Sequence, residues 1–349
     1  MSVECLMRSN IRTLEPYKCA RDEAGGGMRV YLDANENFAP LVDYENINRY
    51  PDSSNLDLRL AFEKAAGFPH TGIIAGNGSD ELIDILFRIF CTPGEDCVLV
   101  LPPSYGEYSV LAGINDVRVE TCPLNSDFSV NEAALLEKIA ECRPKLLFFC
   151  SPNNPSGNLI DRDLILRTAQ KNPGITVVDQ AYIDFAPSGE ILYDDICANE
   201  RLVVLRTLSK AWALAGARIG FMAASRQILD KAYDVKYPYN ISRPAADIAV
   251  RALKDREGFE KRVSQIIETR DRLMKRLASM GKVREVIASD ANFFLVRLDD
   301  PDRVYGELKK RSIVVRNRST NLHCEGCLRI TVGSEAECDE LARALEEIL

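Results

Sequence analysis

Residues 70–224 alternate short β-branched runs with longer amphipathic stretches. This alternation is typical of a sheet whose two faces are covered by helices. We predict strands at residues 72–75, 97–101, 117–122, 145–150, 176–179, 202–206 and 219–223. A helix is predicted from Asp80, with Ser79 and the acidic residues after it as the start signal. The expected fold class is α/β, with a large domain built on a mostly parallel seven-stranded sheet.

Beyond Pro244 the sequence changes to long, charged helical stretches over residues 245–280. Further strands are predicted at residues 293–298, 313–315 and 328–332, and a final helix from Glu335. The segment before residue 28 is predicted to be an arm, with Gly25-Gly26-Gly27 as its flexible joint. We therefore expect an N-terminal arm over residues 1–27, a large domain over 28–243 and a smaller α+β domain over 244–349.

The 349 residues have the composition of an ordinary globular protein, with 46% hydrophobic and 28% charged residues. The excess of 52 acidic over 44 basic residues argues against a nucleic-acid partner. No apolar run reaches the roughly 20 residues that cross a bilayer, and the N-terminal residues lack the layout of a signal peptide. We therefore expect a cytoplasmic protein that does not bind membranes.

The cysteines are scattered singly along the chain, several of them in apolar, strand-like runs. This distribution is typical of reduced, buried thiols rather than of a disulfide framework. The one close spacing is Cys324-x-x-Cys327, where His323 precedes the pair and no second CxxC exists. Because a four-ligand zinc site needs more donors than this, we expect no metal site.

Polar residues gather directly after the predicted strands. In an open α/β sheet, ligands bind where strands end at their carboxyl edge, so these residues are the candidates for chemistry. They are Asn77-Gly78-Ser79-Asp80, the stretch 102–105 with Tyr105, the stretch 151–157 with Asn154, Asp179 followed by Tyr182, and Ser209-Lys210 followed by Arg218. A solvated rim would not be expected to supply such complementary groups from five strand ends.

Together these groups suit a phosphorylated, protonatable heteroaromatic aldehyde. Gly78 and the amides after it can cradle a phosphate at a helix N-terminus, and Arg218 can add directed hydrogen bonds. A carboxylate at Asp179 can keep a pyridine nitrogen protonated, which makes such a ring an electron sink. Lys210 then supplies the amine that forms a Schiff base. Each residue alone is weak evidence, and the joint pattern is far stronger.

At this point the sequence resembles the fold-type I pyridoxal-phosphate aminotransferases, and within that group it is most similar to histidinol-phosphate aminotransferases. The group-level motifs are SPNNPSG (151–157), VVDQAYIDF (177–185) and TLSKAWALAGARIGF (207–221). The narrower motifs are LDANENF (32–38), NRYPD (48–52), GNGSDELI (76–83), PPSYGEY (102–108), DANFFLVRL (290–298) and CLRITVG (327–333). The resemblance runs from about Leu14 to the end and implies an aspartate-aminotransferase-like architecture, with residues 28–243 as the cofactor-binding domain.

The resemblance implies a role for each matched position. Lys210, Asp179 and Tyr182 would be catalytic. Pyridoxal 5′-phosphate would be held by Gly78, Ser79, Asp80, Tyr105, Asn154, Asp179, Tyr182, Ser209, Lys210, Arg218 and Tyr50. Tyr50 would reach the cofactor phosphate of a second subunit, which implies a homodimer with shared active sites. The substrate would be bound by Tyr17, Asn35, Asn154, Arg316 and Arg329.

The implied reaction is transamination of histidinol phosphate with 2-oxoglutarate, giving imidazole acetol phosphate and glutamate in histidine biosynthesis. An aromatic amino-acid aminotransferase or a phospho-amino-acid decarboxylase on the same scaffold stays open as an alternative. A non-catalytic, amine-sensing regulator is disfavoured because only a short arm precedes Tyr31, and a nucleotide-binding dehydrogenase because GNGSD is not GxGxxG. The stretch 316–329 departs from the family pattern in Arg318, His323 and Cys324.

Overall fold

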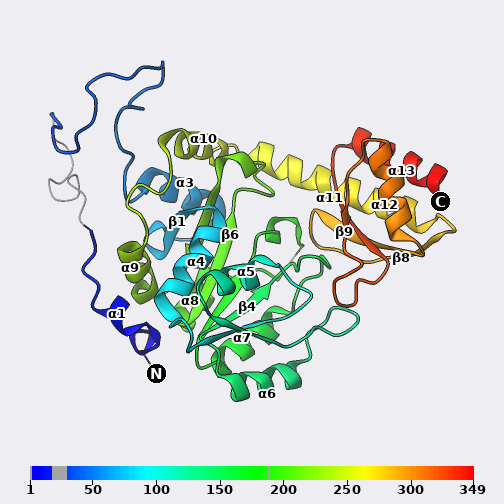
Figure 1. Ribbon diagram of the computed structural model, residues 1–349. Coiled ribbons are helices and arrows are strands. Elements are labelled where there is room, and N and C mark those ends of the chain that lie inside the picture. Colours follow the sequence, from blue (N-terminus) through cyan, green and yellow to red (C-terminus); the bar gives the residue numbers. More distant parts are fainter. Residues whose placement is uncertain (1, 18–29, 188) are drawn as a thin grey trace. The chain divides into compact units, whose positions relative to one another are not determined.

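The structure is a computed structural model that describes residues 2–17, 30–187 and 189–349 (Figure 1). A seven-stranded sheet has the order β1-β7-β6-β5-β4-β2-β3. Its strands are β1 Ile73–Asn77, β2 Cys97–Val100, β3 Arg118–Thr121, β4 Leu146–Cys150, β5 Ile175–Asp179, β6 Leu202–Thr207 and β7 Ile219–Ala223. Strand β4 runs parallel to β2 and β5, whereas β7 runs antiparallel to β1 and β6. All seven predicted strands are confirmed, with small differences at their ends.

The chain divides into two compact units. The first contains Met1–Asp96, Leu111–Arg118 and Leu192–Arg256, and the second contains Cys97–Val110, Val119–Ile191 and Glu257–Leu349. The boundaries expected at residues 27 and 243 stay predictions, and the expected joint at residues 25–27 lies outside the described residues. No helix of the described ranges is long and apolar enough to span a membrane.

The helices of the first unit lie along β1, β7 and β6. They are η1 Val3–Leu6, α1 Ser9–Arg12, α3 Leu56–Ala66, η2 His70–Gly72, α4 Gly78–Phe90, α8 Tyr193–Ala198, η4 Ala215–Ala217, α9 Arg226–Val235 and α10 Arg243–Leu253. Figure 1 shows α4 beside β1, and α4 also contacts β7 and β6. Its apolar residues fall on one face, so Leu82, Ile83, Leu86 and Phe90 are buried.

Helix α4 begins at Gly78, two residues earlier than the sequence predicts. Its N-cap is Asn77, which makes no side-chain cap, and Ser79 lies inside the first turn. The capping bond instead runs from the Asn77 backbone N–H to Glu81 Oε2 at 2.5 Å. The prediction of Ser79 as the start signal was therefore wrong, because the Glu81 carboxylate accepts the hydrogen bond of the Asn77 N–H at the helix start.

The second unit contains β2, β4 and β5 with their helices, and a separate four-stranded sheet. The helices are α6 Glu132–Cys142, α7 Arg162–Lys171, η3 Ile183–Phe185, α11 Arg256–Ala278, α12 Pro301–Lys310 and α13 Glu335–Ile348, while α5 Glu107–Ile114 has residues in both units. Strands β4 and β5 are fully buried along their length, as their continuous apolar sequences predict.

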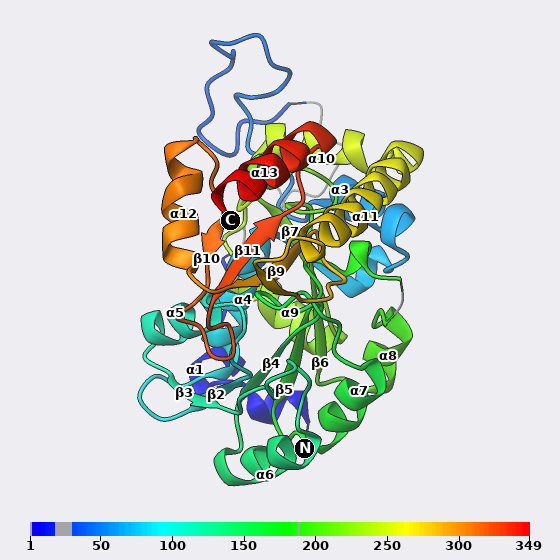
Figure 2. The ribbon, with the colours of Figure 1, turned by 90° about the vertical axis from the view of Figure 1, so that its right-hand side faces the viewer.

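The small sheet is antiparallel and has the order β10-β11-β9-β8. Figure 2 shows β10, β11 and β9. Its strands are β8 Val283–Val286, β9 Phe293–Leu298, β10 Arg316–Asn317 and β11 Cys327–Thr331. One face is covered by apolar side chains of α11, α12 and α13, including Leu277, Leu308 and Leu345. Because side chains alternate along a strand, Phe294, Val296, Leu328 and Ile330 reach this core, and their neighbours face the other way.

The sequence analysis misplaced one strand of this sheet and missed another. The strand predicted at 313–315 is wrong: these residues are not paired, Val314 is 75% exposed, and the strand is formed only by Arg316 and Asn317 opposite Arg329 and Leu328. Strand β8 was not predicted, since VREV is a partly exposed edge strand with a short, weak alternation. The predicted strand at 293–298 and the helix from Glu335 are confirmed.

Candidate functional site

The turn from β1 into α4 brings backbone amides to the end of a strand. Gly78 adopts φ +78°, a conformation that side-chain-bearing residues rarely adopt. A Cβ added at Gly78 would lie 2.6 Å from Arg218 Nη2, so the guanidinium rests directly over the glycine. On the other side, a Cβ at Gly220 would lie 2.5 Å from the Ser79 nitrogen. Two glycines therefore allow the helix start, strand β7 and a guanidinium to approach one another.

Arg218 is held beside this helix start by its own chain. Its Nη2 donates to Asp80 Oδ2 at 3.1 Å and its Nη1 donates to Ser209 Oγ at 3.3 Å. The Arg218 side chain is still 47% exposed, so part of the guanidinium remains available. Gly78, Ser79, Asp80, Ser209 and Arg218, all predicted from the sequence, are brought together in the first unit. The Asp80 carboxylate binds the Arg218 guanidinium.

Lys210 lies on the compact loop that follows β6. The Ser209 backbone N–H donates to Thr207 Oγ1 at 3.1 Å, and the Ala213 N–H donates to the Lys210 carbonyl at 3.0 Å. The Leu208 N–H donates to the Ile219 carbonyl at 3.0 Å, which ties the loop to β7. Lys210 is exposed, directly after the serine that contacts Arg218.

In the second unit, the carboxylate of Asp179 is buried at the end of β5, with 3% of the residue exposed. Tyr108 Oη donates to Asp179 Oδ2 at 2.8 Å, and the Ala181 N–H donates to Oδ1 at 3.0 Å. Burial and the Asp179 charge raise the pKa of Tyr108 well above its usual value. Tyr108 is therefore protonated at neutral pH and acts as the donor to the Asp179 carboxylate.

Tyr108, which contacts the predicted site residue Asp179, was not singled out by sequence reasoning. It belongs to PPSYGEY, in which only Tyr105 was given a role. The ring of Tyr105 meets Tyr108 edge-on at 5.4 Å, and Tyr108 stacks on Phe148 at 4.6 Å. Two tyrosines three residues apart after a strand were the available signal, but the contact with Asp179 spans 71 residues.

Asn154, Tyr182 and Arg329 form a second polar group in this unit. Asn154 Nδ2 lies 3.5 Å from Tyr182 Oη, and Asn154 Oδ1 accepts a hydrogen bond from Arg329 Nη1. Phe293 supports the group, with its ring 5.0 Å from that of Tyr182 and 5.1 Å from the Arg329 guanidinium carbon. Burial raises the pKa of Tyr182, which therefore stays a neutral phenol at physiological pH.

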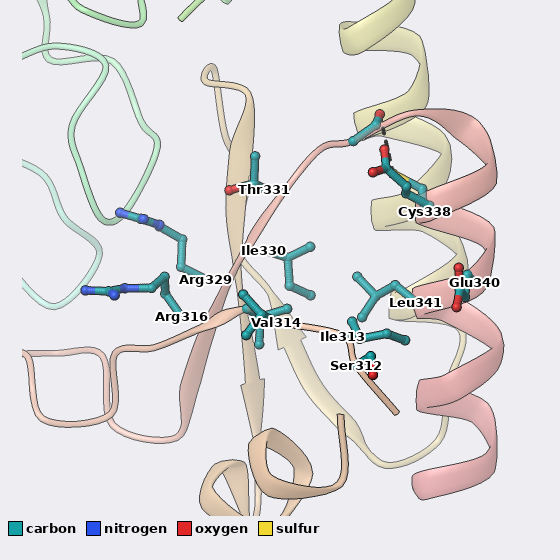
Figure 3. Close-up of a pocket in the computed structure, with 13 residues that line it drawn as sticks. Ser312, Ile313, Val314, Arg316, Arg329, Ile330, Thr331, Cys338, Glu340 and Leu341 are labelled. Carbon is teal, nitrogen blue, oxygen red and sulfur yellow. Dashed lines mark hydrogen bonds between the residues drawn. The ribbon is translucent and has the colours of Figure 1, made fainter. Parts of the chain in front are cut away.

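Arg316 and Arg329 occupy directly opposed positions of β10 and β11. Figure 3 shows their side chains extending side by side, away from α13. They belong to the wall of a cavity of about 520 Å³ formed by β10, β11 and α13. The structure thus brings together the two arginines that the sequence predicts for the substrate.

The predicted N-terminal site residues are less closely connected. Tyr17 is 78% exposed, and Asn35 is exposed with φ +54°. Tyr50 stacks on Tyr239 with ring centroids 4.5 Å apart, and its backbone N–H donates to Glu36 Oε1 at 2.6 Å. Within the same unit, Tyr50 lines a cavity of about 530 Å³ together with Asn77 and Arg218.

Cys324, in the turn before β11, and Cys327, the first residue of β11, are buried free thiols. Burial raises their pKa values, to about 12 for Cys324 and about 11 for Cys327, so both thiols are protonated at neutral pH. Thiolates are the form that binds metal. Among the described residues, no three His, Cys, Asp or Glu side chains form a group that could hold a metal ion.

These observations agree with comparisons to known proteins. The family "Aminotransferase class I and II" matches residues 26–345, and the chain belongs to this family. A protein of Cytophaga hutchinsonii named histidinol-phosphate aminotransferase is 41% identical over 99% of both chains. The histidinol-phosphate aminotransferase structure from Clostridium acetobutylicum has a TM-score of 0.79 and 26% identity over 87% of this chain and 91% of that one. That of Sinorhizobium meliloti, in complex with pyridoxal-5′-phosphate, has a TM-score of 0.79 and 24% identity over 86% and 82%.

The chain is an aminotransferase, and its cofactor is pyridoxal 5′-phosphate. The residues present fit this group in each unit separately. The amides after Gly78, with Arg218 above them, suit a phosphate, since Gly78 leaves the cradle free of a side chain. The buried, hydrogen-bonded carboxylate of Asp179 suits a protonated pyridine nitrogen.

Gly78→Ala is expected to weaken cofactor binding. The new methyl group requires Arg218 Nη2, 2.6 Å from the Cβ position, to move, and φ +78° is strained for alanine. We expect a rise in the cofactor dissociation constant of about tenfold or more, from the displaced charge-assisted hydrogen bond. Fluorescence titration of the apoprotein with pyridoxal phosphate measures this constant.

Gly216→Ala is the matched control for this variant. Gly216 lies on the loop leading to Arg218, but a Cβ there has no neighbour within 4 Å among the described residues, and its φ is not in the positive range. Its dissociation constant should equal that of the wild type. Equal cofactor affinity in both glycine variants would contradict the assignment of the phosphate to this turn.

Proposed function

We propose that this chain transfers the amino group of histidinol phosphate to 2-oxoglutarate, as a step of histidine biosynthesis. The observation that carries the proposal is the similarity to the Cytophaga hutchinsonii protein of that name, at 41% identity over the full length of both chains. The opposed pair Arg316 and Arg329 supports it, because two neighbouring guanidiniums suit a phosphorylated substrate.

Residues of the first unit are proposed to bind the cofactor phosphate. Backbone amides at Gly78 and Ser79 donate from the start of α4, where the helix dipole favours an anion. Arg218 and Ser209 add directed hydrogen bonds. Asp80 orients Arg218 through the 3.1 Å hydrogen bond between them, so its role toward the phosphate is indirect.

Residues of the second unit are proposed to hold the ring. Asp179 faces the pyridine nitrogen, Asn154 and Tyr182 donate to the ring 3-oxygen, and Tyr105 stacks on the ring face. The Asp179 hydrogen bonds from Tyr108 and Ala181 support this role, because they fix the carboxylate in one orientation. Arg329 does the same for Asn154 by donating to its Oδ1. The Asn154 Nδ2 group is then the one that would donate to the ring 3-oxygen.

Lys210 is proposed to bind the cofactor covalently through Nζ and, once released by the substrate amine, to act as the base. The cofactor, when bound, supplies an electron sink for the bond that breaks at the substrate carbon. Lys210 Nζ would accept the proton from that carbon as the general base. Arg316 and Arg329 are proposed to bind the charged group of the substrate, and Tyr17 and Asn35 are proposed as further substrate-binding residues.

The kinetic test is a set of initial rates with histidinol phosphate and 2-oxoglutarate varied together. A shuttle of the amino group through the enzyme predicts ping-pong kinetics, with parallel double-reciprocal lines and glutamate as the product. Intersecting lines, or no glutamate formed, would contradict the proposed function. Release of carbon dioxide from a phosphorylated amino acid would point to the decarboxylase alternative.

We also propose that the enzyme works as a homodimer in the cytoplasm, with Tyr50 donating to the cofactor phosphate of the partner subunit. Support for the location is that the ten cysteines with described structure are all free. Support for the Tyr50 role is that the phenol remains 47% exposed although its backbone is fixed by Glu36. Because Tyr50 also lines a cavity with Arg218 of its own chain, mixing of variants must decide between the two routes.

Mixing Lys210→Ala with Tyr50→Phe is expected to restore wild-type sites. If Tyr50 acts on the partner's cofactor, one site of each mixed dimer combines an intact Lys210 with an intact Tyr50. Random pairing at equal amounts then gives about a quarter of the wild-type activity, with wild-type cofactor affinity in those sites. Activity and cofactor titration after denaturation and joint refolding measure this recovery.

The control mixes Lys210→Ala with Arg218→Ala, whose residues lie in the same unit. No dimer of this mixture contains an intact site, so its activity should stay at background. If the first mixture recovers no more than the control, Tyr50 acts within its own chain and the shared site is wrong.

A further inference from the structure

A third arginine lies beside the opposed pair of the small sheet. Arg318 follows β10, and its backbone N–H donates to the Cys327 carbonyl at 2.9 Å, two positions along the strands from the opposed Arg316 and Arg329. The positive charge of Arg316 lowers the pKa of Arg318, and the positive charge of Arg318 lowers the pKa of Arg329. Arg316, Arg318 and Arg329 therefore form one group, which we call the arginine cluster.

The cluster concentrates positive charge without a counter-ion in the described structure. None of its arginines forms an ion pair with any described residue. Burial lowers the pKa of Arg318 and of Arg329, and the like charges of the cluster lower both further. Like charges placed directly across two strands are unfavourable. Such an arrangement is more readily explained by a bound anion than by stability of the fold.

Two donors of the cluster are buried and unpaired. Arg318 Nε and Arg329 Nε have no hydrogen-bond partner among the described residues. A buried donor without a partner costs free energy, most of all when it carries charge. Arg297, on the same face of the sheet, does have hydrogen-bond partners, because it donates to the carbonyls of Glu325 and His323. Arg318 and Arg329 thus differ from Arg297, although Arg8 and Arg243 also have a buried Nε without a hydrogen-bond partner among the described residues.

The backbone at Arg318 is held from both sides. Asn317 Oδ1 accepts hydrogen bonds from the Ser319 N–H at 2.9 Å and hydroxyl at 2.7 Å, and Asn317 Nδ2 donates to Asp302 Oδ1 at 2.6 Å. Further along, His323 Nε2 lies 3.2 Å from the Leu124 carbonyl. The loop therefore presents Arg318 from a defined position, as a binding residue requires.

We propose that Arg318 is a third guanidinium for the substrate phosphate, and that the cluster selects a doubly charged phosphate monoester over a singly charged or neutral group. This inference rests on the proposed function. Arg329 donates to Asn154 Oδ1, and Asn154 Nδ2 lies 3.5 Å from Tyr182 Oη, so the cluster adjoins two residues that are proposed to contact the cofactor. With three guanidiniums, each phosphate oxygen can accept from a charged donor.

The test compares histidinol phosphate with histidinol, which lacks the phosphate. In Arg318→Gln the KM for histidinol phosphate should rise by about tenfold to hundredfold, the range for one charged hydrogen bond. The rate constants kcat for both donors and the KM for histidinol should not change. Arg318→Lys keeps the charge and should retain most of the preference. Arg284→Gln, at an exposed ion pair with Asp299, is the control and should match the wild type for both donors.

Two further measurements separate recognition from a structural effect. The second pKa of a phosphate monoester is about 6, so the wild-type KM for histidinol phosphate should fall as pH rises from 5.5 to 7.5, and this fall should shrink in Arg318→Gln. Inorganic phosphate should inhibit the wild type competitively and the variant about tenfold more weakly.

Equal losses with both donors, or an unchanged pH profile and phosphate inhibition, would overturn the role of Arg318 while leaving the proposed function intact. If the wild type does not react with histidinol phosphate at all, the proposed function fails. In that case calorimetric titration of the holoenzyme with inorganic phosphate still tests the cluster: binding that Arg318→Gln weakens supports a phosphate site, and no binding contradicts it.

Discussion

Lys210→Ala is expected to abolish turnover while the protein still binds its cofactor. The lysine is proposed to supply both the covalent link and the base, and general-base catalysis alone contributes up to about four orders of magnitude. Retained binding is expected because the proposed phosphate site of Gly78, Ser79 and Arg218 does not involve the lysine side chain. Single-turnover rates and the visible absorbance of bound cofactor measure the two effects separately.

Borohydride reduction of the wild-type holoenzyme provides the chemical control. The label should appear on the peptide that contains Lys210, and the Lys210→Ala variant should bind cofactor without becoming labelled. Label on another lysine, or a turnover rate within tenfold of the wild type in the variant, would show that Lys210 is not the covalent residue.

Asp179→Ala is expected to lower the rate by at least about three orders of magnitude, or about 4 kcal/mol at 1.4 kcal/mol per decade. Without the carboxylate, the ring nitrogen is no longer kept protonated and the electron sink is weakened. The loss should appear in kcat measured at saturating cofactor, because the phosphate is bound by other residues. An Asn at this position is a poor test, since it can still form one hydrogen bond.

Tyr108→Phe is the matched control for the Asp179 variant. It removes the 2.8 Å hydrogen bond to Asp179 Oδ2 and leaves the carboxylate and its bond from Ala181 in place. We expect a loss of about tenfold, the usual effect of one hydrogen bond to a charged group. A loss as large as that of Asp179→Ala would mean that Tyr108, rather than the carboxylate, carries the function. Near-normal turnover of Asp179→Ala would exclude the carboxylate from the reaction.

The sequence indicated most of the residues at the strand ends because their positions depend on local signals. Asp179 ends a fully apolar strand, and Lys210 follows another, so periodicity alone places both at the edge of the sheet. The phosphate turn is equally local, since Gly78 and Ser79 lie between a strand and an amphipathic helix. The structure adds Gly220 to this set. A side chain at Gly220 would collide with the Ser79 nitrogen, and this close approach follows from the pairing of β7 with β1.

The remaining features depend on contacts between distant residues. Tyr108 contacts Asp179 across 71 residues, and the pair of tyrosines after β2 does not by itself predict this contact. The run 313–315 has a strand-like, β-branched sequence, yet its pairing begins only at Arg316, where β11 provides a partner. For Arg318 the sequence showed only an extra basic residue, and its unpaired, buried Nε becomes visible once β10 and β11 are aligned.

A single-turnover comparison of four amines tests most directly the claim that histidinol phosphate is the amino donor. The purified, cofactor-loaded enzyme is mixed with histidinol phosphate, phenylalanine, tyrosine or glutamate without any oxo acid, and the visible absorbance of the bound cofactor is followed. We predict rapid loss of absorbance with histidinol phosphate and with glutamate, which is the product of the second half-reaction. The aromatic amino acids should react much more slowly. Faster reaction with phenylalanine or tyrosine than with histidinol phosphate would contradict the account and assign the enzyme to aromatic amino acids.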